Sequence, residues 1–237
     1  MSRKKNRRSG SGRGLTGRNM RVRVNTARGR KSSSTRWLDR QLNDPYVHEA
    51  QKKGYRSRAA FKLLQLDEKY KILRVGQKVV DLGAAPGGWT QVAVDRVRPD
   101  GKKSRVVAVD LQEMEPVGAA AILCMDFTDD AAAEQLNELL GGAADLVLSD
   151  MAAPVTGHKL TDHLRTTALC ELAHAFAVGS LAPGGTLVMK TFAGGAQGEL
   201  MAAIKVDFEK VRTVKPAASR AESPETYIVA TGFRGDL

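Results

Sequence analysis

Apolar and polar positions along the chain form blocks that predict strands and helices in turn. Short, nearly continuous apolar runs such as KVVDL and RVVAVD are typical of strands buried on both faces. Longer segments with apolar residues three or four positions apart lie between these runs and predict helices. Repeated strand–helix–strand order indicates an α/β fold, a mainly parallel sheet of seven strands with helices on both faces. The predicted strands are Lys78–Leu82, Arg105–Asp110, Ile122–Met125, Asp145–Leu148, Thr186–Lys190, Lys210–Val214 and Thr226–Thr231, and the helices between them are Trp89–Val97, Asp130–Leu140, Thr161–Val178 and Gly198–Lys205.

Two further helices are predicted before the first strand. Asp44 followed by Pro45 combines an N-cap residue with proline at the first helical position, which predicts a helix that runs to about Gly54. Ser57 is a candidate cap for a second helix, Arg58–Tyr70. We expect these helices and the sheet to form one domain, residues 36–237.

Positive charge is concentrated at the N-terminus. The chain has 237 residues and a net charge of +11, yet residues 1–38 contain 13 Lys and Arg and no acid, and the remainder carries 24 basic and 26 acidic residues. A segment rich in Arg, Gly and Ser cannot bury enough apolar surface to offset its ordering entropy, so residues 1–35 are expected to be disordered. A polyanion such as RNA is the expected partner; the alternative is a tail that only improves solubility.

Several classes of protein are disfavoured by composition. No apolar run approaches the roughly 18 residues of a membrane span, and the basic N-terminus lacks the apolar core of a secretory signal. We therefore expect a cytoplasmic protein without membrane contact. Cys124 and Cys170 are too few for a disulfide framework or a cysteine-rich zinc site, and among the histidines only His158 and His163 are close in sequence. We expect no metal site.

Acidic residues mark the carboxyl ends of four predicted strands: Asp81, Asp110, Asp126 and Asp150. Ligands of doubly wound sheets bind at this edge. Asp110 comes 22 positions after Gly88, close to the offset at which an acid on the second strand meets a ribose, and Asp126 could accept a hydrogen bond from an adenine amino group. Each acid alone could equally be a helix cap or a loop residue, but together they favour a ligand site.

The turn after the first strand reads GAAPGG. Its glycines, Gly83, Gly87 and Gly88, do not follow the G-x-G-x-x-G spacing of dinucleotide-binding proteins, and Pro86 removes a backbone donor. The turn therefore suits an adenosyl amino acid better than a pyrophosphate.

A basic cluster precedes the first strand. Lys52, Lys53, Arg56 and Arg58 are suited to RNA phosphates, and the interleaved Tyr55 is a candidate for stacking on a base.

Five segments of the chain together resemble the FtsJ-type family of methyltransferases, and the resemblance extends from about residue 36 to residue 233. Members have a Rossmann-like methyltransferase fold with an antiparallel C-terminal strand, and transfer a methyl group from S-adenosyl-L-methionine to a uridine 2′-hydroxyl in bacterial large-subunit (23S) ribosomal RNA. The five segments are Lys52–Leu63 (KKGYRSRAAFKL), Val79–Thr90 (VVDLGAAPGGWT), Ser149–Ala152 (SDMA), Ala182–Lys190 (APGGTLVMK) and Ser219–Gly232 (SRAESPETYIVATG).

The resemblance implies a catalytic tetrad of Lys62, Asp150, Lys190 and Glu225. One position departs from the family pattern, because Pro154 follows DMAA where the family has asparagine after DMAP. For the cofactor, the resemblance implies Gly87, Trp89, Asp110, Asp126 and Asp150, to which the pattern at the strand ends adds Asp81, Gly83 and Pro86.

The tetrad suits methylation of a poor nucleophile. A ribose hydroxyl needs a proton acceptor or a positive charge that stabilises the developing alkoxide. Lys190 could act as the base if Lys62 depressed its pKa, whereas Asp150 and Glu225 would favour its ammonium form. Both roles stay open at this point.

Three other functions compete with ribose methylation. A base methyltransferase is disfavoured because neither the residues after Asp150 nor the cysteines fit its usual motifs. A non-catalytic ribosome-assembly factor is disfavoured by the intact tetrad, and a nicotinamide-dependent dehydrogenase by the glycine spacing. The expected partner is ribosomal RNA within the large subunit, bound by a monomer.

Overall fold

The computed structural model describes residues 32–100, 102, 105–153, 156–193 and 198–235. Within these residues seven strands form one sheet, in the order β3-β2-β1-β4-β5-β7-β6. Neighbouring strands from β3 to β5 are parallel, and β7 is antiparallel to both β5 and β6. The predicted α/β fold and its antiparallel C-terminal strand are confirmed. The strands are β1 (Lys78–Leu82), β2 (Arg105–Asp110), β3 (Ala121–Cys124), β4 (Ala144–Ser149), β5 (Leu181–Phe192), β6 (Phe208–Val214) and β7 (Glu225–Phe233).

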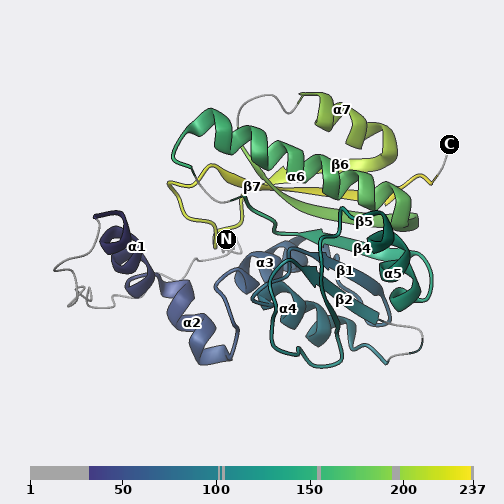
Figure 1. The fold of residues 1–237 in the computed structure, drawn as a ribbon, viewed down its shortest axis with the longest axis horizontal. Coiled ribbons are helices and arrows are strands. Elements are labelled where there is room, and N and C mark those ends of the chain that lie inside the picture. The colour runs from purple at the N-terminus through teal and green to yellow at the C-terminus, as the bar shows by residue number, and fades with distance from the viewer. Residues whose placement is uncertain (1–31, 101, 103–104, 154–155, 194–197, 236–237) are drawn as a thin grey trace, which may run out of the picture.

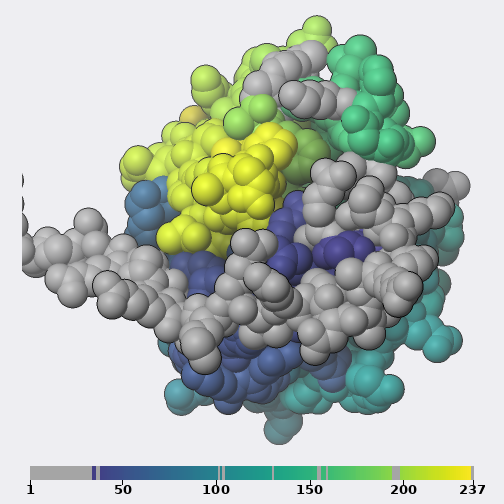
Figure 2. All heavy atoms as spheres, turned by 90° about the vertical axis from the view of Figure 1, so that its left-hand side faces the viewer, coloured from purple at the N-terminus to yellow at the C-terminus, as the bar shows by residue number. Residues whose placement is uncertain are grey.

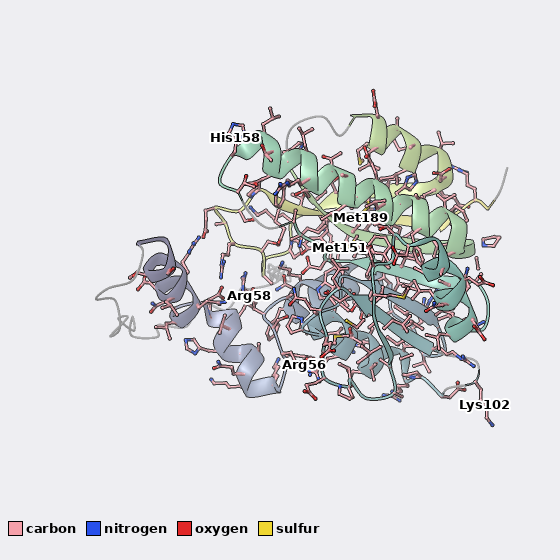
Figure 3. All side chains as sticks on the ribbon, viewed as in Figure 1. Arg56, Arg58, Lys102, Met151, His158 and Met189 are labelled. Carbon is pink, nitrogen blue, oxygen red and sulfur yellow. The ribbon has the colours of Figure 1, made fainter. Side chains whose placement is uncertain are left out.

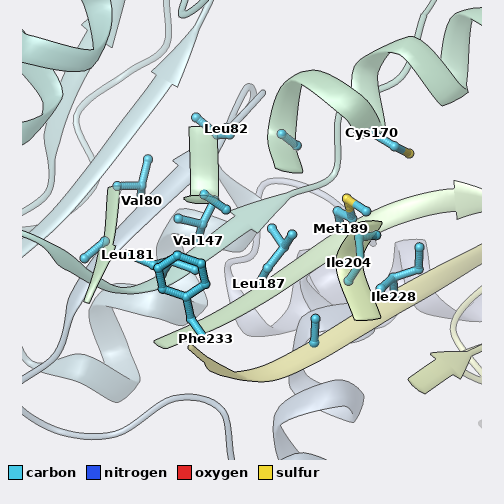
Figure 4. Close-up of a cluster of buried hydrophobic side chains, with 14 of the residues drawn as sticks. Val80, Leu82, Val147, Cys170, Leu181, Leu187, Met189, Ile204, Ile228 and Phe233 are labelled. Carbon is cyan, nitrogen blue, oxygen red and sulfur yellow. The ribbon is translucent and has the colours of Figure 1, made fainter. Parts of the chain in front are cut away.

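Helices cover both faces of the sheet (Figure 1). One face packs against α3 and α4 around the buried side chains of Leu63, Val92 and Val79. The other face packs against α5, α6 and α7, where Val147 and Leu187 of adjacent strands lie in the cluster shown in Figure 4. The helices are α1 (Ser32–Leu42), α2 (Pro45–Lys53), α3 (Ala60–Tyr70), α4 (Gly88–Val97), α5 (Asp130–Leu140), α6 (Lys159–Ser180) and α7 (Gly198–Asp207).

The N-terminal helices differ in part from the prediction. Asp44 caps α2 by accepting a hydrogen bond from the Tyr46 amide, as expected. The cap predicted at Ser57 is wrong, because α3 begins at Ala60 and has Ala59 as an N-cap without a side-chain hydrogen bond. Instead, Ser57 Oγ lies so close to Gly88 that a Cβ atom there would be 2.3 Å away. The short side chain thus seats α4 against the turn before α3.

Helix α1 was not predicted. It covers the last four residues of the segment that we expected to be disordered, and it lies beside α2 at one end of the molecule (Figure 1). Residues 1–31 lie outside the described residues, so the disorder of the tail stays a prediction.

Candidate functional site

The four residues of the predicted tetrad come together at the carboxyl edge of the sheet. Lys62 lies in the first turn of α3, Asp150 directly follows β4, and Lys190 and Glu225 belong to β5 and β7. Lys62 Nζ lies 2.8 Å from Glu225 Oε2 and 3.7 Å from Asp150 Oδ2, and Lys190 Nζ lies 3.1 Å from Asp150 Oδ1. Because β4, β5 and β7 are neighbours in the sheet, residues far apart in sequence form one ion-paired cluster.

Asp150 is the central anion of this cluster. Burial is the largest single influence on its pKa and raises it, but the ammonium groups of Lys190 and Lys62 and the Tyr227 hydroxyl together outweigh burial and hold the pKa below its ordinary value. Asp150 is therefore ionised near neutral pH. Lys190 Nζ also donates a hydrogen bond to the Asp150 backbone carbonyl, which fixes the end of the lysine side chain.

Tyr227 joins the tetrad, although the sequence analysis did not single it out. Its fully buried side chain donates a hydrogen bond of 2.6 Å to Asp150 Oδ1, and its ring centroid lies 5.6 Å from Lys62 Nζ. Burial, followed by the charges of Asp150 and Glu225, raises the pKa of Tyr227 well above its ordinary value, so the hydroxyl stays a donor. The sequence feature that could have identified Tyr227 is its position two residues after Glu225, since alternate residues of a strand share a face.

Ser219 and Cys170 each donate a hydrogen bond to a member of the tetrad. Ser219 Oγ donates a hydrogen bond of 2.7 Å to Glu225 Oε1. Cys170 Sγ donates one of 3.0 Å to the Lys190 backbone carbonyl, and burial raises the pKa of this thiol to about 11, so it keeps its proton. Neither interaction was predicted.

The glycine-rich turn folds back against β2. The amides of Gly83 and Ala84 donate hydrogen bonds of 2.9 and 3.2 Å to the Val109 carbonyl. Gly83 has φ +71°, and a Cβ atom there would lie 2.4 Å from Met151 Cγ. The turn continues through Pro86 to Gly87, the N-cap of α4, which has φ +106°. Glycine is therefore required for backbone conformation at both ends of the turn.

Asp81 has an unsatisfied buried oxygen. Its side chain lies at the end of β1 and is 1% exposed, with Oδ2 accepting a hydrogen bond of 2.7 Å from Thr90 Oγ1. Oδ1 has no partner among the described residues. Burial above all, and then the charges of Asp150 and Asp110, raise the pKa of Asp81 to about 7 against the opposing hydrogen bond from Thr90.

The other two predicted cofactor acids both accept hydrogen bonds from backbone amides. Asp110 Oδ2 accepts a hydrogen bond of 2.9 Å from the Ala85 amide, which ties β2 to the glycine-rich turn. Asp126 Oδ1 accepts hydrogen bonds from the hydroxyl and amide of Thr128, which lower the pKa of Asp126. A cavity of about 450 Å³ adjoins the turn, and its lining residues are Arg56, Ala85, Pro86, Gln112, Glu113, Met114 and Glu115.

The Trp89 indole belongs to the core. It is 3% exposed, donates a hydrogen bond of 2.9 Å to the Ala59 carbonyl, and lies with its ring centroid 5.6 Å from that of Tyr227. The resemblance implies a cofactor contact for Trp89; the structure shows a buried indole, and the cofactor contact stays a prediction.

The predicted RNA-binding residues fall into two groups. Lys52 and Lys53 are exposed in the last turn of α2, where Lys53 Nζ also lies 3.4 Å from a Glu49 carboxylate oxygen. The Arg56 guanidinium donates hydrogen bonds to the carbonyls of residues 86, 115 and 116. Arg58 Nε lies 2.9 Å from Asp44 Oδ2, and its Nη2 donates to the Ala218 carbonyl. Both arginines, which Figure 3 labels to the left of Lys102, thus connect loops.

A second cleft of about 450 Å³ opens beside the tetrad, between α1 and the loop before β7. Figure 2 shows this face, with C-terminal residues in yellow above N-terminal residues in purple and blue. The lining residues are Arg40, Gln41, Arg58, Lys62, Arg220, Glu222, Ser223 and Glu225.

Three further predictions concern Pro154, metal ions and membranes. Pro154 lies outside the described residues. Within the described part of the chain, no cluster of three or more His, Cys, Asp or Glu side chains is placed to hold a metal ion. No helix there combines the length and apolarity that a membrane span requires.

The fold and site together define a class I methyltransferase. A mainly parallel sheet with an antiparallel β7 between β5 and β6, a glycine-rich turn after β1 and acids at the strand ends is the architecture of that class. Residues 55–233 match the family model of the FtsJ-like methyltransferases. The chain belongs to this family.

Curated relatives and a solved structure agree with this assignment. The chain is 58% identical to "Ribosomal RNA large subunit methyltransferase E" of Ruegeria pomeroyi over 95% of this chain and 98% of the relative. It is 56% identical to the protein of the same name from Parvibaculum lavamentivorans, over 95% of this chain and 92% of the relative. A crystal structure described as that of a ribosomal RNA methyltransferase from Plasmodium falciparum is 30% identical, with a TM-score of 0.67 over 77% of this chain and all of the other.

Proposed function

We propose that this chain transfers a methyl group from S-adenosyl-L-methionine to the 2′-hydroxyl of a uridine in large-subunit ribosomal RNA, as a cytoplasmic monomer acting on the assembled or assembling subunit. The observation that carries the proposal is the cluster of Lys190, Asp150, Tyr227, Lys62 and Glu225, which places two ammonium groups and an ionised carboxylate at the ligand-binding edge of the sheet. The names of the 55–58% identical relatives support the choice of RNA.

The residues at the ends of β1 to β3 fit this cofactor. The buried, unpartnered Oδ1 of Asp81 suits the cationic amino group of an adenosyl amino acid, and the Asp110 carboxylate, fixed against the turn, suits the ribose hydroxyls. When bound, the cofactor supplies a sulfonium methyl group as the electrophile. The cofactor-binding residues in this proposal are Asp81, Gly83, Pro86, Gly87, Trp89, Asp110, Asp126 and Asp150.

Lys190 acts in this proposal as a charged donor to the ribose oxygen. Asp150, ionised and 3.1 Å from Lys190 Nζ, favours the ammonium form of the lysine. An ammonium group aimed at the 2′ oxygen orients the hydroxyl and stabilises the negative charge that develops on it. The hydroxyl proton, which becomes strongly acidic as the new O–C bond forms and the methyl–sulfur bond breaks to leave a neutral thioether, passes to the Asp150 carboxylate. Lys62 and Glu225 hold that carboxylate in place.

The test is transfer of labelled methyl from S-adenosyl-L-methionine to large ribosomal subunits of a methylation-deficient strain. The wild type should label a single ribose that resists alkaline cleavage. Lys190→Ala should lower kcat by about 10²–10³-fold with cofactor affinity unchanged, whereas Lys205→Ala, an exposed lysine of α7, should match the wild type. Label on a base, or equal rates for the two variants, would reject the proposal. A kcat that rises tenfold per pH unit above neutral pH would instead make Lys190 the base.

A further inference from the structure

Two arginines of the cleft beside the tetrad share one carboxylate. Arg58 Nε lies 2.9 Å from Asp44 Oδ2, and Arg220 Nε lies 3.5 Å from the same oxygen. Asp44 is buried and its other oxygen caps α2, so its position is fixed by the helix. The loop before α3 and the loop before β7, which are far apart in the chain, thereby present their guanidinium groups to the same space.

The cleft has more positive than negative charge. Lys62 is balanced by Glu225, with which it is ion-paired at 2.8 Å. Asp44 balances one of its two arginine partners, and Glu222 at the rim is the remaining acid among the lining residues. Arg40, an exposed residue of α1, adds a further positive charge from the opposite wall. Three arginines and Lys62 thus line a volume of about 450 Å³ together with two acids, Glu222 and Glu225.

We propose that this cleft binds a phosphodiester of the RNA next to the methylated ribose, with Arg40 and Arg220 as its contacts and Asp44 as a positioning residue. This inference rests on the proposed function and adds a subsite to it. Guanidinium groups recognise phosphate through paired hydrogen bonds and stay charged at any physiological pH. Lys62 and Glu225 of the tetrad line the same cleft as these arginines, so an RNA strand whose ribose reaches the tetrad brings a flanking phosphate to them.

Helix α1 thereby acquires a role in substrate binding. It lies outside residues 55–233, which match the family model, and Arg40 was not among the residues predicted to bind RNA. Arg56, which was predicted, uses its guanidinium on three backbone carbonyls. In this proposal the phosphate contacts of this face are made by α1 and the loop before β7, and not by the loop before α3.

The test measures binding of the full chain to large ribosomal subunits that lack the methyl group, over a series of salt concentrations and without methyl transfer. Arg40→Ala should weaken binding about tenfold and reduce the slope of log K against log salt by about one. Arg40→Lys should restore the slope. Arg74→Ala is the matched control, because Arg74 is an exposed arginine in the loop before β1, at the opposite edge of the sheet.

Catalysis supplies the second measurement. Arg40→Ala should raise KM for subunits about tenfold and leave kcat and cofactor affinity unchanged, and Arg220→Ala should raise KM at least as much. If Arg220→Ala fails to fold, the exposed Arg40 still decides the question. Arg40→Ala binding that matches Arg74→Ala, or a loss confined to kcat, would overturn the subsite. Because binding is measured separately, absence of methyl transfer by the wild type would reject the proposed function without deciding the subsite.

Discussion

Lys190 and Tyr227 lie opposite each other in the antiparallel register of β5 and β7, and both side chains bind the same oxygen of Asp150. The two strands bring the ammonium and phenol groups together, and the loop after β4 brings the carboxylate. Tyr227 also closes the core side of the site, where its ring meets the Trp89 indole. One buried tyrosine thus both packs against the core and holds the Asp150 carboxylate.

We predict that Tyr227→Phe impairs catalysis more than folding. The ring and its packing remain, but Asp150 Oδ1 loses a hydrogen bond to a charged acceptor, an interaction of about 1.5–3 kcal/mol. We expect kcat to fall about tenfold or more, with unchanged affinity for S-adenosyl-L-methionine. Because this hydrogen bond lowers the pKa of Asp150, its loss should also move the acidic limb of the pH–rate profile to higher pH.

Tyr70→Phe is the control for this substitution, since Tyr70 lies at the end of α3, remote from Asp150 in the fold. Its rate and pH profile should match the wild type. An unaltered pH–rate profile in Tyr227→Phe would show that the hydroxyl does not influence the reacting groups.

Many residues of this site could be predicted from the sequence because they lie where apolar strands end. Asp81 and Asp110 each end a short apolar run, and parallel strands place such residues at one edge. Resemblance to the family added the tetrad, whose members are too dispersed for spacing alone to connect. Tyr227 was missed because an aromatic residue in an apolar strand is usually core, and here it is both core and site.

The predictions that failed or stayed incomplete depend on loops. Whether an arginine faces solvent or a backbone carbonyl is set by the tertiary path of other loops, so the sequence could not show that Arg56 is engaged with residues 86, 115 and 116. Helix α1 has few apolar positions and no predicted cap, and Ser57 resembles a cap although its hydroxyl instead lies against Gly88.

Gly83→Ala should destabilise the fold and the cofactor site together. The residue has φ +71°, and its new Cβ atom would lie 2.4 Å from Met151 Cγ and 3.2 Å from Met151 Cα, so the turn must shift. We expect the free energy of unfolding to fall by about 1–3 kcal/mol and cofactor affinity to drop. Calorimetric titration and chemical denaturation measure the two effects.

Gly179→Ala is the matched control, and it should change the free energy of unfolding in the opposite direction. Gly179 lies in α6, and a Cβ atom added there would have no described atom within 4 Å beyond its own helix, so alanine should stabilise the helix by about 0.5–1 kcal/mol. Equal stability of the two variants would show that the turn after β1 tolerates a side chain.

Deletion of residues 1–31 should weaken RNA binding and flatten its salt dependence. Residues 1–38 hold 13 basic side chains and no acid, and removal of each phosphate-binding charge lowers the salt slope by about 0.7–0.9. The deletion ends before α1, so the cleft at Arg40 is retained. Binding of large subunits between low and moderate salt measures the slope, and an unchanged slope would leave the tail with a solubilising role only.

Asp81 should make both stability and cofactor binding depend on pH. Its pKa is about 7 in the folded protein, above the ordinary value of 3.8, so the unfolded chain releases the proton first as the pH rises. The free energy of unfolding should therefore fall between about pH 4 and pH 7 and level off above that range. Asp81→Asn has no titrating group there, and its stability should lack this fall, as denaturation at several pH values would show.

As the pH rises, cofactor affinity of the wild type should increase, whereas its free energy of unfolding falls. The ionised Asp81 carboxylate is the form that attracts a cationic amino group, so affinity for S-adenosyl-L-methionine should rise as the pH passes through about 7. Asp81→Asn should bind weakly at every pH, without that rise, because its amide has no charge. Asp126→Asn, a substitution at a proposed adenine contact, is the control for the pH dependence alone: its affinity should still rise through about pH 7, since Thr128 holds the pKa of Asp126 below its ordinary value. A wild-type affinity that is flat across this range would remove Asp81 from the amino-group site.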